Sequence, residues 1–408
     1  MEDELITIPV AQNTEKPIVK VMGVGGGGCN STNFLYKMGI ANASMLVCNT
    51  DRQSLSKSPV PEKLQLGSGD GAGGKPNIAK QYAQESKEAI KAALSDGTQM
   101  LFLLAGMGGG TGTGASPLVA EIAQEIGILT VGIVTTPYNF EGKVKMAKAI
   151  TGIRNLVSHL DSLIVINNEK IAPDVNFFEA FVKMDEVVAS ITKSIVEIIT
   201  ISSKVNTDFA DVKNTLTNGK VTIIGTGKAH GENRVTQAFE NALDSPVVND
   251  TEIRGAKRIL LQINSSTENS LRKKELDELG DLLKKIGDDS VEIQWGMRPD
   301  ESMGEDVEIT IVATGYESYV FDNGEILNWG DSQPIIVSQP ENTPAEPEVQ
   351  PERPPVSPIQ HVQPMSEPRV VEQAPTTDQD ENVIIFTPSS FEERDEDNNE
   401  WQRGRKKR

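Results

Sequence analysis

Residues 108–114 (GGGTGTG) have the composition of a phosphate-binding loop. The run lies between the apolar residues 101–104 and a helix that we expect to begin near Pro117. Glycines let phosphate oxygens approach the backbone, and the unpaired N–H groups at a helix N-terminus attract anions. The hydroxyl groups of Thr111 and Thr113 can add donors. A flexible glycine turn is the alternative interpretation, and two threonines ahead of a helix argue against it.

A second glycine-rich run, residues 23–30 (GVGGGGCN), follows the first apolar segment and fits the pattern Gly-x-Gly-x-x-Gly. By itself this pattern favours a dinucleotide-binding oxidoreductase, because Asp51 follows about 20 residues later, where a ribose-binding acid would stand. That alternative gives no role to residues 108–114. Two glycine loops that converge on one site suit a nucleoside triphosphate better. A Walker-type P-loop is excluded, because every Gly-Lys pair of the chain is followed by Pro, Val or Ala instead of Ser or Thr.

The elements around these loops predict a parallel α/β domain. Between about residues 17 and 166, apolar β-branched runs alternate with helical patterns, and each run ends in a glycine or asparagine turn. The expected strands are 18–23, 45–49, 100–104, 129–135 and 162–167, and the expected helices are 76–94, 117–126 and 141–160. A long helix should follow over 176–201, where apolar residues recur with helical spacing. Because they occupy more than one face, this helix should connect two domains.

The second half of the chain predicts a smaller α/β domain followed by a linker. The expected strands are 220–225, 258–264, 291–296 and 307–313, and the expected helices are 234–243 and 271–286. From about residue 332 the composition shifts to Pro, Glu, Gln, Val and Ser without periodicity, which is typical of a disordered chain. The expected parts are a flexible N-terminal segment (1–16), a nucleotide-binding domain (17–175), a connecting helix (176–202), a second domain (203–318), a disordered linker (319–380) and a tail (381–408).

The composition limits the possible partners. The chain has 408 residues and a net charge of -20, which argues against a nucleic-acid surface because phosphate backbones are bound by concentrated Lys and Arg. The N-terminal residues lack the features of a signal peptide, and no apolar run approaches the roughly 18 residues of a membrane span. We therefore expect a cytoplasmic protein without direct membrane insertion. The two cysteines and three histidines are scattered, so we expect reduced, buried thiols and no metal-binding cluster.

Further segments give the chain a resemblance to the tubulin/FtsZ GTPase family, and specifically to its bacterial cell-division members. Residues 108–114 match the glycine signature that tubulins and FtsZ share. The other matching segments, in the family's order, are NTD at 49–51, GAG at 71–73, FEG at 140–142, NTDFAD at 206–211 and VATG at 312–315. The resemblance covers about residues 17–318. It implies a GTPase that polymerises head to tail and forms the contractile division ring at the septum, at mid-cell.

The resemblance also implies which residues contact GTP or GDP. The two glycine runs would hold the phosphates, a loop around Gly73 would sense the γ-phosphate, and Glu141 and Lys145 would contact the ribose and phosphates. The implied nucleotide-binding residues are Gly26, Gly27, Gly28, Cys29, Asn30, Asn49, Ala72, Gly73, Gly74, Gly108, Gly109, Gly110, Thr111, Gly112, Thr113, Gly114, Glu141, Lys145, Asn168, Phe181 and Asp185. Cys29 stands where glycine is common in the family. Lys145 stands where arginine is frequent, and lysine lacks arginine's bidentate geometry.

Phe181 and Asp185 match the guanine-binding face of the central helix. Asp185 also fits this role on chemical grounds, because a carboxylate can accept hydrogen bonds from guanine N1–H and from the exocyclic amine. Adenine offers no donor at N1. The two residues lie one helical turn apart on one face, which permits a joint role. A core position for Phe181 and a solvated position for Asp185 are the alternative.

The candidate catalytic residues, Asn206, Asp208 and Asp211, follow the long helix. By themselves they could simply cap a short helix. The resemblance instead implies a loop that enters the nucleotide site of the next subunit and positions or polarises the attacking water. Phosphoryl transfer depends mainly on positioning and charge stabilisation, so carboxylates acting with Mg²⁺ are sufficient. Hydrolysis should then require assembly, whereas a purely structural filament would assemble without regard to hydrolysis.

The tail carries two candidate contacts. Residues 383–386 (VIIF) suit a short docking motif. Residues 403–408 (RGRKKR) suit an electrostatic contact with an anionic membrane, an acidic partner or a neighbouring filament. A solubilising disordered end is the alternative for this basic cluster. The resemblance implies that the tail region binds membrane-tethering and regulatory division proteins.

Overall fold

The computed structural model describes residues 17–171, 176–200, 209–245, 255–286, 290–321 and 324–329. These residues all belong to one compact unit, Met1–Val337. Asn206, Asp208 and both candidate contacts of the tail lie outside the described residues.

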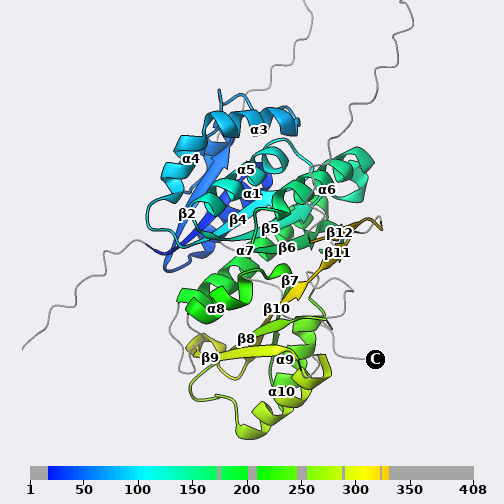
Figure 1. Cartoon of the computed structure of the whole chain (residues 1–408). Helices are drawn as coiled ribbons and strands as arrows, with labels where there is room; N and C mark the ends of the chain where they lie inside the picture. The colour runs from blue at the N-terminus through cyan, green and yellow to red at the C-terminus, as the bar shows by residue number, and fades with distance from the viewer. Residues whose placement is uncertain are drawn as a thin grey trace, which may run out of the picture. The chain divides into compact units, whose positions relative to one another are not determined.

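One sheet has the strand order β3-β2-β1-β4-β5-β6-β7-β10-β8-β9 (Figure 1). Its strands are β1 (Val19–Val24), β2 (Ala43–Asn49), β3 (Glu62–Gln65), β4 (Met100–Gly106), β5 (Leu129–Thr136), β6 (Ser162–Asn167), β7 (Lys220–Ala229), β8 (Arg258–Ser265), β9 (Glu292–Pro299) and β10 (Val307–Tyr316). The strands from β3 to β7 are parallel, and β10 runs antiparallel to both β7 and β8. In this register Val21 pairs with Met45 on one side and with Phe102 on the other.

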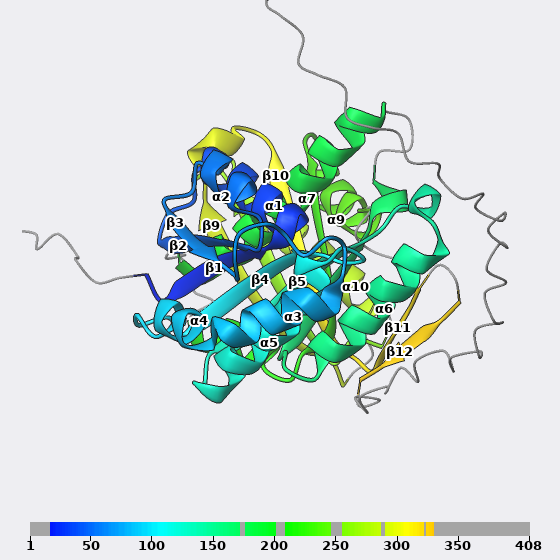
Figure 2. The same ribbon diagram turned by 90° about the horizontal axis from the view of Figure 1, so that it is seen from above.

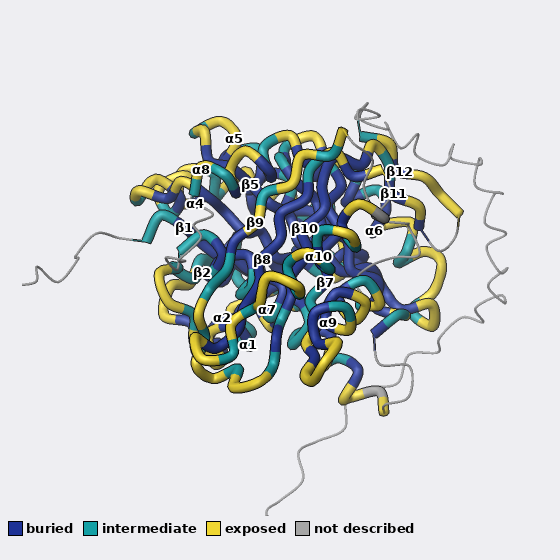
Figure 3. Tube along the Cα trace, turned by 90° about the horizontal axis from the view of Figure 1, so that it is seen from below, coloured by how far each residue is buried: buried dark blue, intermediate teal, exposed yellow. Residues whose placement is uncertain are grey.

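Helices cover both faces of the sheet. They are α1 (Gly25–Met38), α2 (Arg52–Lys57), α3 (Pro76–Glu85), α4 (Lys87–Leu94), α5 (Thr111–Glu125), α6 (Lys143–Val157), α7 (Phe177–Thr200), α8 (Phe209–Leu216), α9 (Arg234–Leu243) and α10 (Lys273–Ile286). Along β1, Val19 and Val21 belong to a core with α1, α7 and α8, whereas Met22 and Val24 belong to a core with α3 to α6, α9 and α10. Figure 2 shows β4 and β5 between the two layers, and the residues of both strands are buried except for the half-buried Gly106. Figure 3 shows β8 and β10 in the colour of buried residues. Burial on both faces explains the continuous apolar runs of the sequence.

The two expected α/β halves share this sheet. β6 and β7 join them through the pairs Ser162 with Lys220 and Leu163 with Val221. The long helix predicted over 176–201 is confirmed as α7, and α9 coincides with the predicted helix 234–243. No helix within the described ranges is long and apolar enough to cross a membrane.

Each glycine run leads into a helix, which corrects two expectations, although residues 107–110 form a turn before the second helix. α5 begins at Thr111 instead of near Pro117, and α1 begins at Gly25, where no helix is predicted. Glycine lowers helix propensity, so the sequence alone favours a loop. Tertiary packing overrides this preference, because a Cβ added at Gly112 would lie 2.4 Å from the carbonyl oxygen of Gly106. The glycine allows α5 to pack directly on the end of β4.

Two other boundaries differ from the prediction. The expected helix 76–94 is divided at Ser86 into α3 and α4. A hairpin of β11 (Ser318–Val320) and β12 (Ile326–Asn328) lies inside the segment expected to be linker from residue 319. Tyr319, Phe321 and Leu327 are buried there, so this stretch folds although the exposed residues between them obscure the apolar pattern.

Candidate functional site

The two glycine runs meet at the carboxyl ends of neighbouring parallel strands. β1 and β4 are adjacent, and the strand order reverses between them, which is where α/β sheets commonly bind ligands. A Cβ added at Gly25 would lie 2.6 Å from the amide nitrogen of Gly112, so the two backbones are in direct contact. We call these two runs, residues 23–30 and 106–114, the glycine edge.

Loops that follow β2 and β3 also reach the glycine edge. The Oγ1 atoms of Thr50 and Thr111 lie 2.7 Å apart, within hydrogen-bond distance. A Cβ added at Gly110 would lie 3.0 Å from the Cβ of Ala72. Residues 72–74, which are expected to sense a γ-phosphate, therefore lie beside the expected phosphate loop.

The N-termini of α1 and α5 both lie at the glycine edge. Among the described residues, no side chain caps either helix. The N–H groups of a first helical turn have no acceptor within the helix, and together with the helix dipole they favour an anion. Gly109, Gly110 and Thr111 are partly exposed and can be reached by a ligand. Thr113, in contrast, is buried, and its hydroxyl group stabilises the turn itself: Oγ1 accepts a hydrogen bond from the backbone N–H of Gly108 at 2.9 Å.

The other predicted glycines divide into exposed and buried positions. Gly26 and Asn30 are exposed, and Gly27 is half-buried. Gly28 and Gly114 are buried, and a Cβ added at either would lie within 2.1 Å of a backbone carbonyl oxygen. The exposed and half-buried residues can contact a ligand. The two buried glycines instead allow the helices to pack against neighbouring backbone.

Cys29 and Asn49 form the wall behind the first glycine run. The Cys29 Sγ donates to the carbonyl oxygen of Cys48 at 3.5 Å, and it lies 4.0 Å from Nδ2 of Asn49. Burial raises the pKa of Cys29 to about 12, so the thiol is protonated at neutral pH. Both cysteines are free and buried, as expected. The side chain of Cys29 is directed at β2, which leaves its backbone as the part able to contact a nucleotide.

Asp185 of α7 contacts α1 through a buried serine. The hydroxyl of Ser31, which is 3% exposed, donates to Oδ1 of Asp185 at 2.7 Å. Desolvation raises the pKa of Asp185 to about 6, and the hydrogen bond from Ser31 opposes this rise. The carboxylate is therefore ionised at neutral pH, yet it is poorly solvated and retains unused acceptor capacity.

Phe181 lies one turn before Asp185 on α7, and Asn168 lies on a short helix whose Glu169 accepts a hydrogen bond from the backbone N–H of Asn139. Phe181 packs edge to face on Tyr138, with ring centroids 5.3 Å apart, so it is neither solvated nor part of the deep core. Asn168 begins the 3-10 helix η2 (Asn168–Lys170) directly after β6. Its Oδ1 is buried and has no hydrogen-bond partner within the described part of the chain. Such an atom costs free energy unless a donor from a ligand or water reaches it.

Glu141 and Lys145 form an ion pair across one helical turn. Glu141 also accepts a hydrogen bond from the backbone N–H of Tyr138 at 3.0 Å, which closes the 3-10 helix η1 (Asn139–Glu141). A Cβ added at Gly108 would lie 2.8 Å from the Cγ of Lys145. The lysine stem therefore lies against the phosphate loop, although its ammonium group is paired with Glu141.

Asp211 lies on α8. This helix is near the amino ends of the parallel strands, whereas the glycine edge lies at their carboxyl ends. α8 ends shortly before Lys220, whose backbone N–H donates to the carbonyl oxygen of Asp161 at 3.0 Å, beside the amino end of β6. The six residues of β6 span about 20 Å. The structure therefore brings the predicted nucleotide-binding residues together and leaves Asp211 apart from them.

Sequence reasoning missed three residues at this site. Ser31 contacts Asp185, Tyr138 contacts Phe181, and Lys148 donates to the carbonyl oxygen of Gly74 at 3.2 Å. A helix start at the first glycine run would have placed Ser31 one turn after Gly27, but it would not have shown the contact with Asp185. No sequence signal indicates Tyr138 or Lys148.

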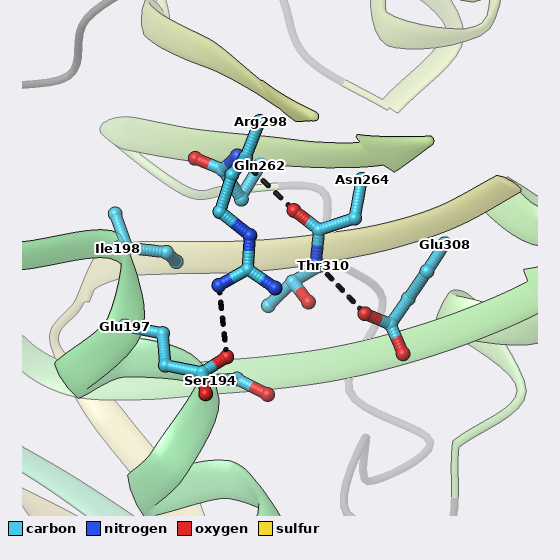
Figure 4. Close-up of a pocket in the computed structure, with 8 residues that line it drawn as sticks. All are labelled: Ser194, Glu197, Ile198, Gln262, Asn264, Arg298, Glu308 and Thr310. Carbon is cyan, nitrogen blue, oxygen red and sulfur yellow. Dashed lines mark hydrogen bonds and ion pairs between the residues drawn. The ribbon is translucent and has the colours of Figure 1, made fainter. Parts of the chain in front are cut away.

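A second polar site lies between the C-terminal half of α7 and the strands β8, β9 and β10 (Figure 4). We call it the polar pocket; it is lined by Ser194, Glu197, Ile198, Gln262, Asn264, Arg298, Glu308 and Thr310. Arg298 pairs with Glu197 and with Asp300, each at 3.1 Å. Nδ2 of Asn264 donates to Oε2 of Glu308 at 2.8 Å. Its charged side chains thus all have partners, whereas the buried Oε1 of Gln262 has none among the described residues.

Comparisons with known proteins cover both halves of the sheet. The family model described as "Tubulin/FtsZ family, GTPase domain" matches residues 18–176, and that described as "FtsZ family, C-terminal domain" matches residues 220–317. The chain is 41% identical over 350 residues to the cell division protein FtsZ of Porphyromonas gingivalis, which covers 83% of this chain and 76% of the relative. It is 40% identical over 309 residues to that of Azotobacter vinelandii, covering 74% of this chain and 78% of the relative. The solved FtsZ dimer of M. jannaschii has a TM-score of 0.70 at 37% identity, over 78% of this chain and 94% of that chain.

Proposed function

This chain belongs to the FtsZ family of tubulin-like GTPases, and from this premise we propose how its residues bind GTP and complete the hydrolytic site. It is a guanine-nucleotide-binding GTPase with a cytoskeletal role in cell division. The dinucleotide-binding alternative has no further support. The strand order of the first half is compatible with it, but its relatives are GTPases and not oxidoreductases.

The convergence of two helix N-termini at the glycine edge is the observation that carries the proposal. The first turns of α1 and α5 surround the phosphates with backbone N–H groups, and residues 72–74 approach the γ-phosphate from the side. Thr111 adds a hydroxyl group. Because neither run has a lysine in the Walker position, Lys145 supplies the nearby positive charge, after leaving Glu141 when the phosphates bind.

The guanine base lies against α7 on this account. Asp185 accepts from N1–H and from the exocyclic amine, and Phe181 provides an apolar surface for the ring. The buried Oδ1 of Asn168 accepts a further donor from the nucleotide. This set selects guanine over adenine, since adenine would leave the Asp185 carboxylate without a donor from N1.

Mg²⁺ fits the site as an ion held mainly by the nucleotide. Among the described residues, no group of three or more His, Cys, Asp and Glu side chains could hold a metal ion. Mg²⁺ usually keeps several waters and binds substrate phosphates, and it takes oxygen ligands such as the neighbouring hydroxyl groups of Thr50 and Thr111. When bound, it neutralises charge on the phosphates.

The catalytic carboxylate comes from the next subunit of a head-to-tail filament. Asp211 lies at the far edge of the sheet from its own glycine edge, so it can act only on the nucleotide of another copy. Asn206 and Asp208 precede it in the chain and belong to the same proposed catalytic segment. One subunit then contributes the phosphate-binding surface and its neighbour positions the attacking water.

Exposed apolar side chains around the guanine side of the glycine edge suit a contact with that neighbour. Phe140 is 65% exposed, Val144 73%, Phe178 83% and Val182 55%. They lie at η1, at the start of α6 and at the start of α7, which the contact between Tyr138 and Phe181 holds together. Burying such residues against a second copy would favour association.

The test follows phosphate release and sedimentable polymer as the protein concentration is raised. We expect the GTPase rate per subunit to rise from near zero in step with polymer, and GDP to support less assembly than GTP or a non-hydrolysable analogue. A rate per subunit that is independent of concentration and polymer content would contradict the shared site. Assembly that is indifferent to the nucleotide would favour a purely structural filament.

We further propose that residues 381–408 bind membrane-tethering and regulatory division proteins and bring the filament to mid-cell. Residues 383–386 are the candidate docking motif, and the basic residues 403–408 are a candidate electrostatic contact. Removing residues 381–408 should abolish mid-cell localisation in a cell and leave GTP-dependent polymerisation intact. Unchanged localisation would contradict the role of the tail.

A further inference from the structure

The first turns of α1 connect the phosphate side of the site to its base side through a single hydroxyl group. Ser31 lies one helical turn after Gly27, and its Oγ is 3.2 Å from the carbonyl oxygen of Gly27 and 2.7 Å from Oδ1 of Asp185. Ser31 is 3% exposed, so its hydroxyl makes its hydrogen bonds inside the protein and not with bulk solvent. α1 and α7 pack against each other along this contact.

We propose that Ser31 is a positioning residue for base recognition: its hydroxyl fixes the carboxylate of Asp185 in the orientation that reads the guanine edge. This inference rests on the proposed guanine contact of Asp185. Ser31 itself touches neither the base nor the phosphates.

The geometry of base recognition explains why such a positioning residue matters. Guanine presents N1–H and its amine side by side, so both carboxylate oxygens of Asp185 must lie in the plane of the base. A carboxylate on a flexible side chain loses rotational freedom when it is held this way. Ser31 fixes one oxygen in advance by a charge-assisted hydrogen bond. It uses one acceptor position of Oδ1, which leaves the second position of Oδ1 and all of Oδ2 for the base.

The single proton of the Ser31 hydroxyl can serve only one of its two acceptors. An ionised Asp185 is the stronger acceptor and takes it. A protonated Asp185 would donate to Oγ of Ser31, and the hydroxyl would then turn to the carbonyl oxygen of Gly27. The protonation state of Asp185 therefore decides whether the Ser31 hydroxyl donates to the carboxylate or to the carbonyl oxygen of Gly27 in the first turn of α1.

The other titratable groups near Asp185 do not replace this interaction. Tyr138, next to Asp185, feels the negative charges of Glu141, Glu169 and Asp185, so this side of the site carries several acids. On α7 itself, Lys183 pairs with Glu186 at 2.8 Å. Ser31 is thus the group that favours the ionised form of Asp185 by a hydrogen bond.

The experiment measures the affinity of the full chain for GTP and for ITP, which lacks the exocyclic amine, between about pH 5.5 and 8. We expect Ser31→Ala to reduce the preference for GTP over ITP about fivefold, because the carboxylate is no longer held for two hydrogen bonds. We also expect the pH midpoint of GTP binding to move upward. The ionised form of Asp185 loses a hydrogen bond, so binding is lost at a higher pH as the solution is acidified.

A variant pair and a matched control separate positioning from a general structural effect. In an Asp185→Asn background, Ser31→Ala should change the preference by less than about twofold, since the partner is already altered. Thr32→Val is the control: Thr32 is buried on the same helix and donates to the carbonyl oxygen of Gly28 at 2.8 Å, but it does not contact Asp185. It should leave both the preference and the pH midpoint unchanged.

Each outcome has a defined meaning. An unchanged preference and pH midpoint in Ser31→Ala would overturn the role of Ser31 while leaving the proposed GTP site intact. An effect of the same size in the Asp185→Asn background would also overturn it, because Ser31 would then act elsewhere. If the wild-type chain did not prefer GTP to ITP, the proposed base contact itself would fail, and this inference with it.

Discussion

The glycine edge and the polar pocket lie near opposite ends of α7, and they differ in how their charged and dipolar groups are paired. At the glycine edge, the described residues leave two helix N-termini without side-chain caps. In the polar pocket, Arg298 is already paired with Glu197 and Asp300, and Asn264 with Glu308, although the buried Oε1 of Gln262 has no hydrogen-bond partner among the described residues. Uncapped helix N-termini favour an anionic ligand, whereas paired charges indicate a structural contact.

The largest expected effect is that of a methyl group inserted into the glycine edge. Gly112→Ala places a Cβ 2.4 Å from the carbonyl oxygen of Gly106, so α5 must move away from β4. We expect the free energy of unfolding to fall by about 3 kcal/mol and GTP binding to drop more than about 100-fold. Denaturant unfolding and nucleotide titration measure the two effects.

Gly280→Ala is the matched control for this substitution. Gly280 lies inside α10, and an added Cβ there would meet nothing within 4 Å. We expect this variant to be more stable by about 0.5 to 1 kcal/mol and to bind GTP normally. If Gly112→Ala behaved like Gly280→Ala, the close packing of α5 on the end of β4 would have no functional role.

A smaller effect should appear when the pH is lowered. Burial raises the pKa of Asp185 to about 6, and the proposed contact with the guanine base requires the ionised carboxylate. The GTP affinity should therefore be full above this pH and fall as the pH drops through it, approaching about tenfold per unit well below the midpoint. A titration of Asp185→Asn should lack this dependence. The same pH profile in both proteins would locate the titrating group elsewhere.

The smallest effect on GTP binding is expected at the polar pocket. Arg298→Ala leaves the partly buried carboxylate of Asp300 without its cation and leaves Glu197 only its longer ion pair with Lys193, at 3.7 Å, so we expect the free energy of unfolding to fall by about 1 to 3 kcal/mol. GTP affinity should not change. Lys284→Ala is the control, because the pair of Lys284 with Asp281 is exposed and should contribute at most about 0.5 kcal/mol. A loss of GTP binding in Arg298→Ala would remove the contrast between the two sites.

The sequence predicted the elements whose pattern is set by burial and missed the features set by close backbone packing. The strands of the parallel sheet other than β3, and α7, follow from apolar periodicity, and they lie where predicted. The edge strand β3 was not predicted, because its residues are mostly polar. The start of α5 at Thr111 could not be predicted, because the glycines that suggest a loop are those that let the helix approach Gly106.

The parts of the candidate site that have a local sequence pattern were predictable, and the contacts between residues far apart in the sequence were not. The two glycine runs carry a local signal for phosphate binding, and Asp185 has a chemical reason to recognise guanine. The contact of Ser31 with Asp185 joins residues 154 positions apart, so no local pattern reveals it. The opposite position of Asp211 depends on the direction of α7 across the sheet, which the linear order of motifs does not give.

The central claim is that one subunit supplies the nucleotide site and the next supplies the catalytic carboxylate. The most direct measurement is the GTPase rate of a mixture of Asp211→Ala and Asp185→Ala, compared with each variant alone at the same total concentration. The first variant keeps the GTP site and lacks the acid, and the second keeps the acid and binds GTP poorly. The shared site predicts that the mixture hydrolyses GTP well above the sum of the two separate rates. A mixture no more active than that sum, while the two variants still co-polymerise, would contradict the claim.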